Sequence, residues 1–133
     1  MGQKKRNTYQ LNWQATDPAP FSPNTPATGV LTGAMASTNT IYSNIQDISN
    51  ADNVALEVTF TGTPTGVLSV KASESGNIFY SLTFDPALAQ PAGSAGGYMI
   101  DLNQCPFRYI HMEYVNSSGS GTLTVVCGSK DLN

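Results

Sequence analysis

The stretch NVALEVTFTGTPTGVLSVKAS, residues 53–73, decides the fold. Apolar side chains occupy every second position on both sides of the turn TGTPTG, which contains Pro64 and Gly66. Alternation with a period of two residues is typical of a strand that has one buried and one exposed face. We therefore predict two consecutive strands joined by a turn. Their buried faces are expected to carry Val54, Leu56, Val58, Phe60, Leu68, Val70 and Ala72.

The same alternation recurs along the chain after residue 29, and no stretch has helical periodicity over a convincing length. ESGN and NSSGSG are expected to form hairpin turns, and residues 86–90 a short turn of helix. About seven or eight short antiparallel strands at roughly ten-residue spacing indicate an all-β domain, a β-sandwich or jelly roll. The further predicted strands are residues 38–49, with a break near Asn44, and 78–84, 97–102, 107–115 and 122–128.

Residues 1–28 form a separate compositional block, which we predict to be an extended, Pro-rich N-terminal arm ahead of a β-sandwich domain at 29–133. Four prolines between residues 18 and 26 exclude a helix there. Tyr9, Leu11 and Trp13 alternate, so an extended arm would place these three large side chains on one face. The arm would fold back onto its own domain or lie on a neighbouring subunit, and the sequence leaves both paths open.

Charged residues are scarce, at 11% of the chain against about 25% in a typical soluble domain. Three of the basic residues, Lys4, Lys5 and Arg6, lie together, whereas the rest of the chain has three basic residues against nine acidic ones. This basic tip would be a solubilising terminus or a contact for a polyanion. Because three charges neutralise few phosphates, we expect no sequence-specific binding of nucleic acid.

Two cysteines, Cys105 and Cys127, would allow one disulfide. The first residues lack the apolar segment of a signal peptide, so synthesis is expected in the cytoplasm, where reduced thiols are favoured. Whether these cysteines pair stays open. No apolar run approaches the length of a membrane span, so no membrane partner is expected.

A search for catalytic chemistry finds no motif. His111 is the single histidine and lies in the middle of a predicted strand, where a structural role is the usual one. The chain contains no Gly-x-Ser-x-Gly elbow, and the spacing of its histidine and cysteines matches no zinc site. We therefore predict a protein without enzymatic activity, catalytic residues, metal or cofactor.

The segments GTPTGVLSV, IDLNQCPFRYI and SGSGTLTVV resemble a family of small β-rich structural proteins of tailed bacteriophages, over roughly residues 45–130. In this family the first and last of these segments are hairpins. The resemblance implies that the protein is a virion component. Capsid decoration (cement) proteins are one class of such components, and they are typically trimeric jelly rolls on the outer shell. It implies no catalytic residue, and it does not extend to the N-terminal block.

The resemblance leads to the first hypothesis, a capsid decoration protein on the outer capsid surface of the virion. It would bind the major capsid protein, whose subunits it would bridge and stabilise. It would also bind further copies of itself and form a homotrimer. The alternative is a carbohydrate-binding jelly-roll module of a phage tail or fibre, with Tyr98 or Tyr109 as the stacking platform. A third hypothesis, a nucleic-acid-binding coat protein, conflicts with the acidic body. The candidate contacts of the arm with a capsid or neighbouring subunit are Lys4, Lys5, Arg6, Tyr9, Leu11, Trp13 and Phe21.

Overall fold

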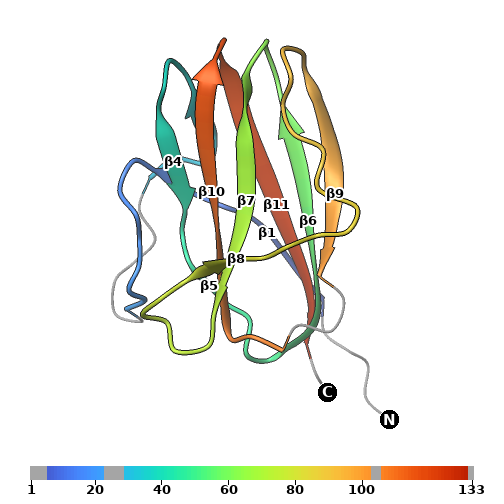
Figure 1. Ribbon diagram of the computed structural model, residues 1–133. Coiled ribbons are helices and arrows are strands. Elements are labelled where there is room, and N and C mark those ends of the chain that lie inside the picture. The colour runs from blue at the N-terminus through green and yellow to red at the C-terminus, as the bar shows by residue number, and fades with distance from the viewer. Residues whose placement is uncertain (1–5, 23–28, 103–105, 132–133) are drawn as a thin grey trace.

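The computed structural model describes residues 6–22, 29–102 and 106–131. These residues form eleven strands in two antiparallel sheets that pack face to face (Figure 1). The described residues contain no helix, and therefore none long and apolar enough to cross a membrane. The prediction of an all-β sandwich is confirmed.

Sheet A has the strand order β1-β11-β6-β9, with β3 also paired to β11, and sheet B has the order β2-β4-β10-β7-β8, with β5 also paired to β10. The strands of sheet A are β1 Arg6–Gln10, β3 Gly33–Met35, β6 Ala51–Phe60, β9 Gly96–Leu102 and β11 Gly121–Asp131. Those of sheet B are β2 Trp13–Gln14, β4 Thr40–Ser43, β5 Gln46–Asp47, β7 Thr65–Ser73, β8 Tyr80–Ser81 and β10 Tyr109–Ser118.

The pairing of the strands is that of a jelly roll. β1 pairs with the last strand, β11; inside this pair β4 pairs with β10, β6 with β9, and β7 with β8. Such nested pairing is what one long antiparallel hairpin gives when it is rolled into two sheets. Rolling also explains why the predicted hairpins at TGTPTG and NSSGSG are wrong. Each of these turns carries the chain from one sheet to the other, from β6 to β7 and from β10 to β11.

The core lies between the sheets and follows the predicted alternation. Along β6, Val54, Leu56, Val58 and Phe60 are buried, while Glu57 and Thr59 between them are exposed. Because each strand contributes one face to the core, the alternation in the sequence becomes an apolar layer between the two sheets. The remaining predicted core positions, Leu68, Val70 and Ala72, are also buried. On β10 and β11 the core further contains Ile110, Met112, Tyr114, Leu123, Val125 and Cys127.

Asn116 ties together the turns at one end of the sandwich. Its side chain accepts a hydrogen bond from the Tyr114 hydroxyl (2.7 Å) and donates to the carbonyl oxygens of Ser37 (2.8 Å) and Gly119 (3.1 Å). Its backbone N–H donates to the carbonyl of Asn39 (2.9 Å). One buried amide therefore fixes the β3–β4 turn and the β10–β11 turn to the same strand.

The segment after β7 differs from its prediction. Instead of a strand over residues 78–84, only Tyr80 and Ser81 pair with β7, and residues 86–90 contain no helical turn. The turn after β7 is also wider than a tight hairpin, because the pair that closes it is Ala72 with Tyr80. Within this turn the Gly76 carbonyl accepts a hydrogen bond from Phe21 N–H (2.7 Å) in the N-terminal segment. Ile78 and Tyr80 point to solvent, with 61% and 69% of their surface exposed.

The N-terminal segment takes the first of its two possible paths in the described residues, back onto its own domain. β1 pairs with β11 in sheet A, and β2 pairs with β4 in sheet B. Leu11 and Trp13 enter the core between the sheets, where they are 1% and 2% exposed. Residues 6–14 thus contribute strands to both sheets.

Candidate interaction surface

The structure places the seven candidate contact residues of the arm in different surroundings. Lys4 and Lys5, and the side chain of Arg6, lie outside the described residues. Tyr9 packs against the core, and the sulfur of Cys127 lies 3.5 Å from its hydroxyl. Cys127 is a free, buried thiol whose pKa is raised by burial, and Cys105 lies outside the described residues.

Leu11 and Trp13 are core residues in this structure. The backbone of Trp13 exchanges two hydrogen bonds with Val30, at 2.7 and 3.0 Å. Its ring lies against Gly33, where an added Cβ would be 2.9 Å from the Trp13 Cγ atom. Because Leu11 and Trp13 are buried in their own chain, neither side chain offers surface to a partner in this conformation.

Phe21 belongs instead to an aromatic cluster on the outer face of sheet B. Its ring lies 4.7 Å from the ring of Tyr109, and the Arg108 guanidinium lies 5.3 Å from the centre of the Tyr109 ring. Tyr109 is therefore only 8% exposed, although it points away from the core. The N-terminal segment covers this face rather than leaving it open.

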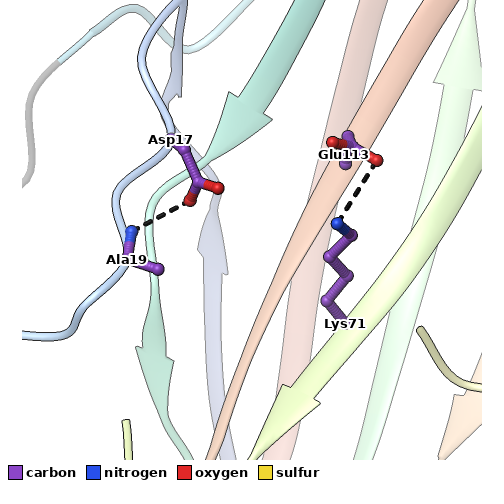
Figure 2. Close-up of polar contacts among 4 residues, drawn as sticks. All are labelled: Asp17, Ala19, Lys71 and Glu113. Atoms are coloured by element: carbon purple, nitrogen blue, oxygen red, sulfur yellow. Dashed lines mark hydrogen bonds and ion pairs between the residues drawn. The ribbon is translucent and has the colours of Figure 1, made fainter. Parts of the chain in front are cut away.

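His111 lies on the same outer face of sheet B and is 2% exposed. The rings of His111 and Phe79 form a T-shaped contact, with 4.6 Å between their centres. Burial lowers the pKa of His111, an effect that the charge of nearby Lys71 adds to and that of Asp17 opposes. Lys71 itself forms an ion pair with Glu113 (3.5 Å), and Asp17 accepts a hydrogen bond from Ala19 N–H (3.0 Å), as Figure 2 shows.

His111 is enclosed by neighbouring side chains of its own chain. The ring is sealed from solvent, and its Nδ1 atom has no hydrogen-bond partner among the described residues. Nor do the described residues contain a group of three His, Cys, Asp or Glu side chains that could hold a metal ion.

An open apolar surface lies beside β8. Ile78, Tyr80 and Phe107 line a groove there together with Glu74. We call this feature the β8 groove; its remaining lining residues are Ala72, Ser73 and Ser75. Exposed apolar and aromatic side chains gathered around a groove are typical of a surface that binds another protein.

Sequence reasoning missed the β8 groove, because the alternation of Ile78 and Tyr80 looks like that of a strand. It also misplaced the proposed sugar platform. Tyr109 is covered by Phe21, and Tyr98 faces inward, with its buried hydroxyl lacking a partner among the described residues. Burial, and to a smaller extent the electrostatic effect of neighbouring Tyr114, raises the pKa of Tyr98 to about 12. These two tyrosines therefore do not form an exposed platform.

Comparison with known proteins identifies a shared fold. No family model matches the chain, and no curated protein matches it. The SPBc2 prophage-derived protein YomS superimposes with a TM-score of 0.52 at 8% identity, over 98% of this chain and 97% of YomS. At this identity the likeness shows the fold alone.

Two viral proteins match less well. Infectious bursal disease virus VP2, from a subviral particle, has a TM-score of 0.48 at 12% identity, over 96% of this chain and 33% of VP2. The tailspike protein 4 domain of bacteriophage CBA120 has a TM-score of 0.46 at 12% identity, over 94% of this chain and 19% of that one. Neither adds to what YomS shows.

Proposed function

We propose that this chain is a structural protein of a phage virion, and that it decorates the outer capsid surface as a cement protein. The observation that carries the proposal is the β8 groove, which presents Ile78 and Tyr80 to solvent from a tightly hydrogen-bonded jelly roll. Its partner would be the major capsid protein, whose neighbouring subunits it would bridge. No catalysis is part of this function.

Two further observations support the proposal. The sequence resembles small structural proteins of tailed phages in three segments, and two of them form β7 with its preceding turn and β11 with its preceding turn. YomS, which has the same fold over nearly its whole length, is a prophage-derived protein.

A cement protein acts by mass action. Anything that binds only the assembled shell stabilises it by RT ln(1 + [L]/Kd), about 2.7 kcal/mol per site at a hundredfold excess over Kd. A homotrimer centred on a threefold axis of the shell would repeat this contribution at three capsid subunits. The charge-poor surface suits such close contacts, because few ions must be stripped of water.

The test is co-sedimentation of the protein with mature capsids stripped of accessory proteins. We expect saturable binding and a higher temperature of DNA release, and we expect the pair of changes Ile78→Asp and Tyr80→Asp to abolish both. Val67→Asp is the matched control, because Val67 is 54% exposed but is not part of the β8 groove. Equal binding by the groove variant and the control would exclude the groove, and no binding by the wild type would exclude cement.

Carbohydrate binding is the second candidate, since Tyr80 is 69% exposed and its ring is free to stack on a sugar. A glycan array separates the two candidates. Binding of bacterial surface glycans that is lost on Tyr80→Ala, together with no binding to capsids, would favour a tail or fibre module.

A further inference from the structure

One edge of sheet A has no further strand paired to it among the described residues. β9 is the last strand in the order of that sheet and pairs only with β6 among the described strands. Its seven residues pair with β6 without any shift of register, and they include no proline or lysine. Long, regular edges of this kind are templates for pairing with another strand, and most proteins interrupt them.

At the edge of sheet B, by contrast, loop residues form hydrogen bonds with the backbone groups that no strand pairs. Beyond the short β8, the side-chain amide of Gln90 takes the place of a strand: it accepts a hydrogen bond from Leu68 N–H (2.6 Å) and donates to the Leu68 carbonyl (3.0 Å). The carbonyl of Pro91 then accepts from Gly66 N–H (3.1 Å). The loop between β8 and β9 thus satisfies the edge of β7, and the described residues show no equivalent contact along Gly96–Asp101.

The sequence of β9 is complementary to itself when two copies run antiparallel with Met99 opposite Met99. Gly97 of each copy then lies opposite Asp101 of the other, and Tyr98 lies opposite Ile100. No like charges oppose each other, and the inward-facing pair is aromatic against β-branched, which favours strand pairing. The single chain already requires glycine at position 97, because an added Cβ would lie 2.5 Å from the Val58 carbonyl oxygen.

Met99 supplies an apolar contact at the centre of this register. It lies on the outer face of sheet A and is 62% exposed in the single chain. Two such side chains opposite each other would come within about 4.5–5.5 Å at their Cβ atoms. Each would cover apolar surface of the other that is otherwise in water.

We propose that two copies of this chain pair through β9, antiparallel and about a twofold axis at Met99, so that sheet A continues from one copy into the other. The inference goes beyond the proposed function and does not depend on it. Because the contact is twofold, it is distinct from the threefold contact of a homotrimer. A particle that uses both contacts contains an even number of chains.

The experiment measures the mass of the full-length protein in solution by sedimentation velocity and light scattering. The variants are Met99→Lys and Met99→Glu, each alone and mixed in equal amounts, with Val67→Lys as the control on sheet B. In the expected result the wild type and the control contain an even number of chains and each Met99 variant has half that mass. Mixing restores the full mass, because the introduced lysine and glutamate then face each other across the axis.

Three outcomes would overturn the pairing. The wild type could contain an odd number of chains, both Met99 variants could keep its mass, or the mixture could stay at half mass. Circular dichroism of each variant verifies that the fold is intact. The change is expected to leave the fold intact, because Met99 points to solvent in the single chain.

Discussion

Replacing Trp13 by alanine tests whether the N-terminal segment belongs to the domain. Trp13 is 2% exposed, lies against Gly33, and is held by two backbone hydrogen bonds to Val30. Removing a fully buried tryptophan costs about 3–5 kcal/mol, because the transfer free energy is lost and a cavity remains. That cost is comparable with a large part of the stability of an ordinary domain, about 5–15 kcal/mol.

The assay is urea unfolding followed by far-ultraviolet circular dichroism, since the variant has lost the only tryptophan as a fluorescence probe. With a slope of about 2 kcal/mol per molar urea, the midpoint should fall by about 2 M. Trp13→Phe should cost less, because it keeps most of the ring and removes a buried indole N–H that has no partner among the described residues.

Leu31→Ala is the control, because Leu31 is near Trp13 in the sequence but 50% exposed. Its effect should stay within about 0.5 kcal/mol. A loss below about 1 kcal/mol for Trp13→Ala would refute the reasoning, since that is far less than a buried tryptophan is worth. It would mean that the N-terminal segment does not pack into its own core in solution.

Two further predictions concern buried polar residues. Because burial places the pKa of His111 below its ordinary value of 6.5, unfolding takes up a proton as the pH falls through 6.5, so stability should decrease from pH 7.5 to 5.5. His111→Gln should show a smaller decrease in its urea midpoint, and an equal decrease would contradict the assignment to His111. Asn116→Ala should cost about 1–3 kcal/mol, because the buried Tyr114 hydroxyl loses its acceptor. Thermal unfolding measures this cost, with the exposed Ser118→Ala as a control that should melt like the wild type.

The alternation of β6 and β7 was enough to predict the class of fold and the core, because a period of two residues determines which side chains share a face. It could not predict which strands become neighbours. The turn TGTPTG would serve a hairpin or a crossing between sheets, and only the nested pairing of all the strands selects the crossing. The path of Tyr9, Leu11 and Trp13 was undetermined for a similar reason, since their pattern fits any apolar groove.

The candidate surface was less predictable than the core. Ile78 and Tyr80 alternate like strand residues, but the turn before them is held by Phe21, which is more than fifty positions away in the sequence. The burial of His111 also depends on Phe79, which lies outside its own strand, and its pKa depends on the charges of Asp17 and Lys71. Contacts of this kind follow from the folded arrangement and leave no local signal.

The register of β1 on β11 has a mechanical consequence. Arg6 lies opposite Lys130, so the chain enters and leaves the domain side by side, away from the turns that Asn116 joins (Figure 1). A force that pulls Arg6 and Lys130 apart would therefore break the hydrogen bonds between β1 and β11 one after another. It would not load all of them at once, as a shearing force along the strands would. Separation of β1 from β11 would continue to Leu11 and Trp13, where further extension would require these buried side chains to leave the core. A load carried through one end alone would not separate the two strands.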